Sequence, residues 1–230
     1  MEKEDAIKNA EGMNPEAVPG IIQSERRNRM EKGSAALRKL DTRSAVSIAM
    51  LSAVAFVLAF AEFPVPLSPS FAKFDLSDLP AMIGAFAFGP IEGIMIELIK
   101  NLLRFFSSTT GGIGELANFL MGASFVGAAG LIYERHRTKK AALIGCLAGS
   151  TAMAAMAAAA NYFILLPLFE TFMPVDRLIA SFSEFLPFIR TKFDIIFLNA
   201  LPFNLLKGFA VSAVTILLYK RLSPILKGRQ

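Results

Sequence analysis

The last long apolar segment of the chain restricts its fold more than any other feature, because an asparagine and a lysine lie in its interior. This segment, Phe193 to Tyr219, is long enough to cross the roughly 30 Å hydrocarbon core of a bilayer as a tilted helix. Asn204 and Lys207 lie in its interior, three residues apart, and therefore share one face of a helix. A lysine at that depth costs about 2.5–3.5 kcal/mol on insertion scales, so it must face protein or a cavity and have a partner.

Two interpretations of these two side chains follow. They form either a structural brace between helices or part of a ligand site, and we favour the ligand site. Pro202 lies close by and lacks a backbone N–H, so the carbonyl of Leu198 loses its usual helical donor. The brace predicts that Lys207→Met leaves the fold intact or stabilises it, because a costly buried charge disappears. The ligand site predicts that Lys207→Met and Asn204→Leu lower ligand affinity while the ligand-free protein keeps its stability.

The composition indicates a membrane protein. The chain is 54% hydrophobic with a mean hydropathy of +0.50, values that no ordinary soluble domain has. The single Cys146 excludes an intrachain disulfide, and the single His136 leaves little room for histidine catalysis. The net charge of +5 does not indicate nucleic-acid binding, because the basic residues cluster beside apolar segments, as they do in membrane proteins.

Six apolar segments predict an all-α integral membrane protein, a bundle of six transmembrane helices in residues 43–230 with a short cytosolic tail. Residues 1–42 are polar and charged, and we expect a mobile cytosolic leader there. Lysine and arginine clusters precede the first segment, follow the fourth and end the chain, which places both termini in the cytoplasm of a cell-membrane protein. The segments are Ser44–Phe63, Pro80–Phe88, Ile91–Phe106, Ile113–Tyr133, Ala141–Phe169 and Phe193–Tyr219.

Charged residues inside and between these segments predict local contacts. Glu97 precedes Lys100 by three residues in the third segment, so an internal ion pair is expected. Asp78 is expected to cap the second helix, which has Pro80 in its first turn. Two long loops, 64–79 and 170–192, are expected outside, the second lying partly on the membrane surface as an amphipathic stretch.

A candidate binding pocket lies in the outer third of the predicted bundle. Asn118, Asn161 and Tyr162 collect there together with several phenylalanines, and this mixture suits a planar amphipathic ring that carries hydroxyls. Each phenylalanine alone is better explained by helix packing than by ligand contact. Asn161 is a stronger candidate, because a lone amide after an alanine run needs a hydrogen-bond partner.

Enzyme chemistry finds no support in the sequence. It contains no G-x-S-x-G or H-E-x-x-H motif, no metal-ligand spacing and no Walker A lysine loop. We therefore expect no catalytic residue, metal or cofactor, and any use of ATP must come from another subunit. A self-sufficient proton-coupled carrier that uses Glu92, Glu97 and Glu115 is an open alternative.

The first segment carries a stripe of small residues. Ala45, Ala49 and Ala53 follow one another at four-residue steps, and small residues at this spacing allow another helix to approach closely. Alanine is common in membrane helices, so coincidence is the competing explanation.

Four motifs resemble the substrate-binding S components of energy-coupling factor (ECF) transporters, and among these the riboflavin-binding type. The resemblance covers residues from about 43 to 227. The motifs are Lys73-Phe74-Asp75-Leu76-Ser77-Asp78-Leu79-Pro80, Gly84 with Phe88-Gly89-Pro90, Asn161-Tyr162 with Pro167, and Pro202-Phe203-Asn204-Leu205-Leu206-Lys207-Gly208.

This resemblance implies a function and partners. An S component binds a vitamin from outside and delivers it inward when it docks on a transmembrane coupling subunit that carries two ABC-type ATPases. Carried over by motif, Asn161, Asn204 and Lys207 would contact riboflavin, and the loop around Phe74 and Asp75 would close over it. The resemblance also implies that Ala49 and Ala53 lie on the docking face. An S component for another vitamin is the nearest alternative.

Overall fold

The computed structural model of the chain describes residues 42–64, 73–108, 110–171, 174–184 and 186–227. The chain divides into two units, residues 1–43 and 44–230. Apart from Thr42 and Arg43, the first unit lies outside the described residues, and the predicted polar leader lies there with it.

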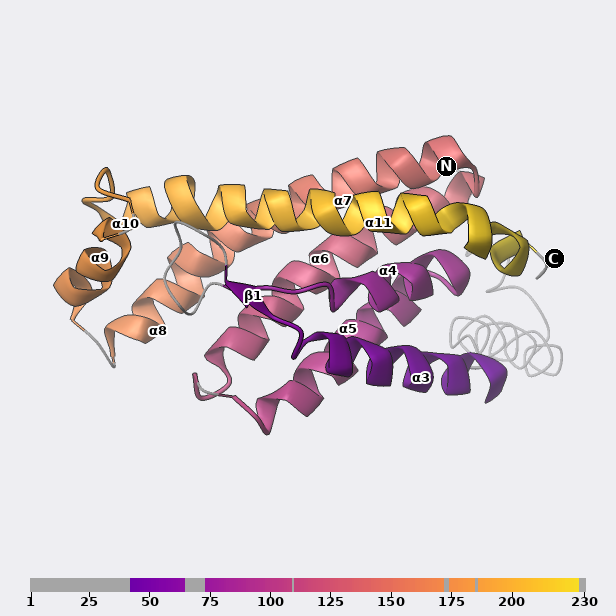
Figure 1. Cartoon of the computed structure of the whole chain (residues 1–230), viewed down its shortest axis with the longest axis horizontal. Coiled ribbons are helices and arrows are strands. Elements are labelled where there is room, and N and C mark those ends of the chain that lie inside the picture. The colour runs from indigo at the N-terminus through magenta and orange to yellow at the C-terminus, as the bar shows by residue number, and fades with distance from the viewer. Residues whose placement is uncertain (1–41, 65–72, 109, 172–173, 185, 228–230) are drawn as a thin grey trace, which may run out of the picture. The chain divides into compact units, whose positions relative to one another are not determined.

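The second unit is built almost entirely from helices (Figure 1). The sequence predicted helices alone, and the structure departs from this in one pair of two-residue strands, β1 (Phe63–Pro64) and β2 (Lys73–Phe74). The pair is antiparallel, with Phe63 opposite Phe74. Two π-helical segments, η1 (Asn161–Leu165) and η2 (Ile195–Ala200), interrupt the long helices. The α-helices are α3 (Thr42–Leu58), α4 (Asp78–Ala87), α5 (Pro90–Phe105), α6 (Ile113–His136), α7 (Lys139–Ala160), α8 (Leu166–Glu170), α9 (Val175–Ser183), α10 (Lys192–Asp194) and α11 (Leu201–Lys227).

A helix occurs at each of the six predicted apolar segments, within the described part of the chain. Three of them are long and apolar enough to cross a membrane: Ile113–His136, Lys139–Glu170 and Lys192–Leu218. Ser44–Leu58 and Asp78–Ala87 are shorter apolar helices. The chain is therefore a membrane protein by its helices, while the full count of six spans stays a prediction.

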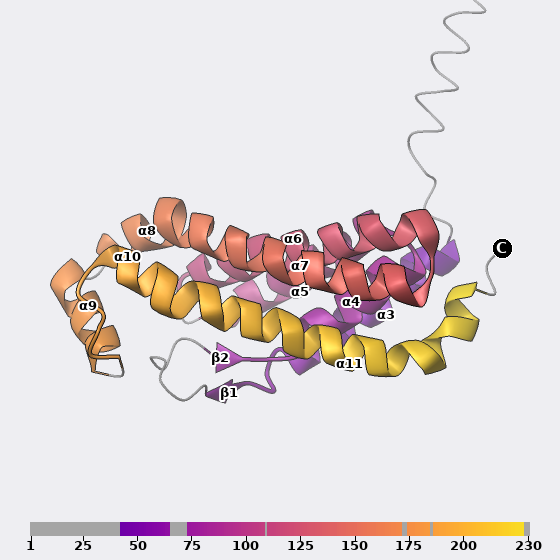
Figure 2. The same cartoon turned by 90° about the horizontal axis from the view of Figure 1, so that it is seen from above.

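One apolar core joins the helices of the second unit. Side chains from α3, α4, α5, α6, α7 and α11 meet in it, among them Ile48, Met82, Ile96, Phe125, Cys146 and Val211. The helix α4 contacts α5, α6 and α11. Figure 2 shows α8, α9 and α10 gathered at one end of the long helices, where Leu166, Phe182, Ile189, Ile195 and Ile196 form a second apolar cluster.

The break between α4 and α5 arises from Gly89 and Pro90. Gly89 has a φ of +136°, a conformation that L-residues rarely adopt, and Pro90 occupies the first position of α5. The expectation for the start of α4 was wrong. Asp78 is the first residue of the helix, and its carboxylate pairs with Lys100 and Lys207. Ser77 holds the cap position without a side-chain cap bond, and its hydroxyl accepts from the Lys100 ammonium at 3.1 Å.

Small residues allow three helices to approach closely. A Cβ atom on Gly149 of α7 would lie 2.7 Å from the carbonyl oxygen of Phe125 in α6. A Cβ atom on Gly208 of α11 would lie 2.9 Å from the Ser150 side chain in α7. These glycines hold α6, α7 and α11 together at backbone distance, as is common where membrane helices pack.

We expect Gly149→Ala to reduce the free energy of unfolding by about 1–3 kcal/mol, because the new methyl group meets backbone that cannot move aside. Gly127→Ala in α6 is the matched control: its Cβ atom would meet only the end of the flexible Ile94 side chain, at 3.2 Å. Both changes gain the same helix propensity, so this contribution cancels. Thermal unfolding in detergent micelles measures the difference, and equal melting temperatures would contradict it.

Candidate functional site

A network of buried charges lies between α4, α5 and α11. The ammonium of Lys100 lies 2.6 Å from Asp78 Oδ1 and 2.6 Å from Glu97 Oε2. The ammonium of Lys207 lies 3.0 Å from Asp78 Oδ2 and 3.3 Å from Asp75 Oδ2. All five side chains are buried. The expected Glu97–Lys100 ion pair is therefore confirmed, and Lys207 has the partners that its depth requires.

Asp78 connects the two lysines, because each of its oxygens faces a different ammonium. Asp75 adds the loop before α4 to the network: its Oδ1 accepts the backbone N–H of Ser77 at 2.8 Å, and its Oδ2 faces Lys207. A buried charge without a partner is very costly, so each lysine depends on these carboxylates. The network thereby holds α11 against α4 and α5 and fixes Lys207 in one position.

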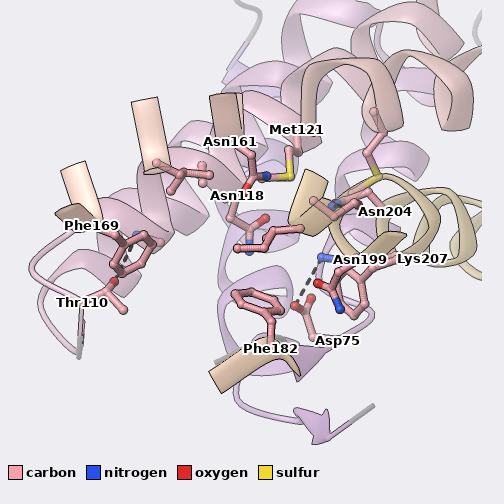
Figure 3. A pocket seen from close by; sticks show the side chains of 17 residues that line it. Asp75, Thr110, Asn118, Met121, Asn161, Phe169, Phe182, Asn199, Asn204 and Lys207 are labelled. Carbon is pink, nitrogen blue, oxygen red and sulfur yellow. Dashed lines mark hydrogen bonds and ion pairs between the residues drawn. The ribbon is translucent and has the colours of Figure 1, made fainter. Parts of the chain in front are cut away.

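A cavity of about 210 Å³ lies against this network, and Figure 3 shows its walls. Asp75 and Lys207 form one side of it, and Asn118, Asn161, Asn199 and Asn204 supply amide groups. The remaining wall is mainly apolar: Gly114, Ala117, Met121, Met153, Leu165, Phe169, Phe182, Ile195, Ala200 and Phe203, together with the hydroxyl of Thr110. An apolar cavity with a few convergent polar groups is the usual form of a small-molecule site.

Two asparagines present the same arrangement to the cavity. Asn161 Nδ2 donates to the carbonyl of Ala157, and Asn204 Nδ2 donates to the carbonyl of Ala200, both at 2.8 Å. The partner expected for Asn161 therefore lies in its own helix. A carbonyl oxygen only accepts, so these bonds fix which end of each amide is the NH₂ group. Each side chain keeps one N–H and one acceptor oxygen with which to recognise a ligand.

One π-helical segment begins at Asn161 and the other ends four residues before Asn204, and prolines explain where the two segments occur. Pro167 and Pro202 lack an N–H and remove the α-type bonds to the carbonyls of Phe163 and Leu198, which lie inside η1 and η2. Wider bonds form instead: Leu166 N–H donates to the Asn161 carbonyl and Leu201 N–H to the Ile196 carbonyl. The segment η1 begins at Asn161, and π-helical turns are frequent at functional sites.

The structure brings together most, but not all, of the residues expected in the site. Asn161, Asn204, Lys207, Asp75 and Asn118 line the cavity. Phe74 and Tyr162 are not among its lining residues. Phe74 pairs with Phe63 in the strand pair, and Tyr162 is 47% exposed and stacks on Phe193 with the ring centroids 5.6 Å apart.

Several lining residues were not singled out from the sequence. Asn199 is the clearest, since it is a polar residue in the same apolar run as Asn204. Phe182 comes from α9, in the segment expected to lie on the membrane surface, and is buried against the cavity. An amphipathic pattern gives the apolar face of a helix and leaves its tertiary partner open, so no signal in the sequence linked Phe182 to this cavity.

The stripe of small residues on α3 lies outside the packing of the second unit. Ala45, Ala49 and Ala53 are exposed, whereas Ile48 and Ser52 of the same helix are buried. The exposed side of α3 also carries Val46, Met50, Val54 and Val57. This face is free to contact lipid or another protein.

The chain is similar to known transport proteins. A family model described as "ECF transporter, substrate-specific component" matches residues 43–219. The riboflavin transporter RibU of Staphylococcus aureus (strain TCH60) is 37% identical over 195 residues, which cover 85% of this chain and 98% of the relative. The riboflavin transporter FmnP of Bacillus subtilis (strain 168) is 31% identical over 188 residues, covering 80% and 94%.

A solved structure is also similar in fold. It was published as the structure and mechanism of the S component of a bacterial ECF transporter, and it superposes with a TM-score of 0.66 at 38% sequence identity. The match covers 80% of this chain and 98% of that one. The similarity therefore extends through nearly all of the second unit.

Both interpretations drawn from the sequence expected Lys207→Met to leave the ligand-free protein stable, and the ion pairs of Lys207 reverse that expectation. Removing the ammonium leaves Asp75 and Asp78 buried with too little positive charge, so we expect the ligand-free protein to lose about 3–5 kcal/mol of stability. Adding Asp75→Asn should restore part of this loss.

Lys192→Met is the matched control for this experiment. Lys192 pairs with Glu170, but both side chains are substantially exposed, 43% and 31%, so we expect a change of less than about 1 kcal/mol. Thermal unfolding of the three variants in the same detergent decides the matter. If Lys207→Met and the Lys192→Met control have the same melting temperature, the ion pairs of Lys207 contribute nothing to stability.

Proposed function

Because this chain belongs to the family of substrate-specific components of ECF transporters, we propose that it binds riboflavin from outside the cell and delivers it inward. Riboflavin transporters are its relatives over most of the chain. The observation that carries the assignment is the amide-lined cavity beside Lys207, whose lining includes Asp75, Asn161, Asn204 and Lys207 from the motifs that resemble the family. The protein acts as a binding and delivery subunit, and its chemistry is recognition.

The chemistry of riboflavin suits this cavity. Its flat isoalloxazine ring is apolar on both faces and carries an imide edge with one N–H between two carbonyl groups, while its ribityl chain carries hydroxyls. Phe169, Phe182 and Phe203 offer apolar surface to the ring. Asn161 and Asn204 each have an N–H and an oxygen available, which complement a partner that both donates and accepts.

Lys207 has a defined place in this proposal. Its ammonium carries three N–H groups; one donates to Asp75 Oδ2, and Asp78 Oδ2 lies 3.0 Å away as an ion-pair partner, on a second side of the ammonium. The third is available to a carbonyl or hydroxyl oxygen of the ligand. The two carboxylates neutralise the ammonium, so its contribution is a directed hydrogen bond and not a strong attraction for anions.

The remaining features of the proposal follow from the family. Six helices cross the cell membrane with both termini in the cytoplasm, and α9 lies at the outer surface. The exposed stripe Ala45, Ala49 and Ala53 on α3 docks on a transmembrane coupling subunit, which carries two ABC-type ATPase subunits. A self-sufficient carrier would transport riboflavin in vesicles without these subunits, and an S component would not.

Titration with riboflavin should give roughly 1:1 binding in the nanomolar range, which corresponds to about −12 kcal/mol. Asn161→Leu and Asn204→Leu each remove hydrogen bonds from a buried site and should each weaken affinity by roughly tenfold or more. Phe163→Leu is the control, because Phe163 lies two residues from Asn161, is 73% exposed and does not line the cavity. Binding of thiamine as tight as that of riboflavin would refute the assignment.

A separate experiment tests the docking face. Ala49→Phe and Ala53→Phe should each weaken assembly with the coupling module several-fold and leave riboflavin affinity unchanged, because the bulky ring prevents close helix approach. Ala155→Phe is the control, an exposed alanine on α7. Pull-down of the module measures assembly. If both α3 variants assemble as well as the Ala155→Phe control, the module docks on another face.

A further inference from the structure

The strand pair that precedes Asp75 is too small to hold its own position. Its strands β1 and β2 contribute two residues each, and an isolated pair of strands is marginally stable at best. Apolar burial adds little, because the side chain of Phe63 in β1 is 60% exposed. Asp75 follows β2 directly and lines the cavity. The position of its carboxylate therefore depends on what fixes the two strands.

Polar contacts fix the pair at both strands. Beside β2, Asp75 Oδ1 accepts the backbone N–H of Ser77 at 2.8 Å, and its Oδ2 lies 3.3 Å from the ammonium of Lys207. Beside β1, Glu62 is the residue before the strand, and it pairs with Arg104 of α5. The side chains of Arg104 and Glu62 are only 21% and 17% exposed, so salt screens this pair less than it screens a surface ion pair.

Arg104 holds the end of α3 as well. Its Nη1 donates to the carbonyl of Ala59, the residue after the last one of α3, while its Nη2 donates to Glu62. Its guanidinium also lies over the ring of Phe60, 5.5 Å from the centroid. The last carbonyls of a helix have no intrahelical donor and attract positive charge. A planar group with five N–H donors serves these acceptors together, which a lysine ammonium does not reproduce.

We propose that Arg104 is a positioning residue for the binding site, although it is not among the residues that line the cavity. It fixes Glu62 and the turn after α3, and the pairing of the strands carries this constraint to Phe74, the neighbour of Asp75. Asp75 in turn holds Lys207, whose ammonium is offered to the ligand. Arg104 thereby keeps the cavity in its binding geometry and slows release of the ligand, a second effect that rests on the proposed function.

Hydrogen exchange of the whole ligand-free protein in detergent separates this role from a purely local one. Arg104→Met keeps an unbranched apolar side chain and removes the guanidinium. If Arg104 only completes the end of α3, exchange rises in residues 59–64 alone. If it positions Asp75, the backbone amides of residues 74–78 also exchange several-fold faster, that of Ser77 among them. Unchanged exchange in α6 and α7 shows that the fold is intact.

Lys192→Met is the matched control, because it removes another partly exposed ion pair, with Glu170, that lies outside the strand pair and its contacts. It should leave exchange in residues 74–78 unchanged. Arg104→Lys should restore part of the protection, since a lysine can still pair with Glu62. If Arg104→Met folds poorly, Glu62→Gln removes the carboxylate and keeps the arginine, and it should accelerate exchange in the same residues. Unchanged exchange there in both Arg104→Met and Glu62→Gln would overturn the proposal.

The dissociation rate of riboflavin is the second readout. Arg104→Met should release riboflavin several-fold faster than the wild type and change the association rate little, because every side chain that lines the cavity is still present. Equal dissociation rates for the two proteins would overturn the effect on release. A wild-type protein that does not bind riboflavin would refute the proposed function, and the exchange experiment, which uses no ligand, would still decide whether Arg104 positions Asp75.

Discussion

The pairing of Lys207 and Lys100 with shared carboxylates is the interaction on which the rest of this structure depends. Asp78 lies between the two ammonium groups and joins α11 to α5 through the first residue of α4. Neither lysine is tolerable alone in an apolar bundle, and neither is Asp78 without them. Because Asp75 completes the network from the loop before α4, one electrostatic arrangement sets both the helix positions and one wall of the cavity.

Departures from regular helix shape much of the remaining wall. Pro167 and Pro202 each remove a backbone donor, and a π-helical segment lies beside each proline. Asn161 and Asn199 lie in these segments, and Asn204 follows in the next turn of α11. The ion pairs and the two irregular helices together enclose a cavity in which the amides of Asn161 and Asn204 each already have one bond satisfied. Such preorganisation reduces the entropy that a ligand must lose on binding.

Local patterns in the sequence predicted what depends on neighbouring residues and failed where distant segments meet. The apolar segments predicted the helices, and the spacing of Glu97 and Lys100 predicted their ion pair. The partner of Lys207 was not predictable, since Asp75 is 132 residues away and Asp78 had a plausible local role as a helix cap. Phe182 was missed for the same reason, because its tertiary partners lie far away in the sequence. Tyr162 was wrongly included, because the direction of a side chain in an interrupted helix depends on packing and does not follow the helical period.

The long separation between Asp75 and Lys207 also has a consequence for how the protein is made. Helices enter the membrane in the order of synthesis, and α4 and α5 arrive with Lys100 already matched to Asp78 and Glu97. Asp75 and one oxygen of Asp78 lack their ammonium partner until the last helix is in place. Until α11 inserts, the growing chain holds excess negative charge in its interior, and Lys207 gains its partners only by joining a nearly complete bundle. A chain that ended before Lys207 would therefore leave Asp75 and one oxygen of Asp78 buried without their ammonium partner.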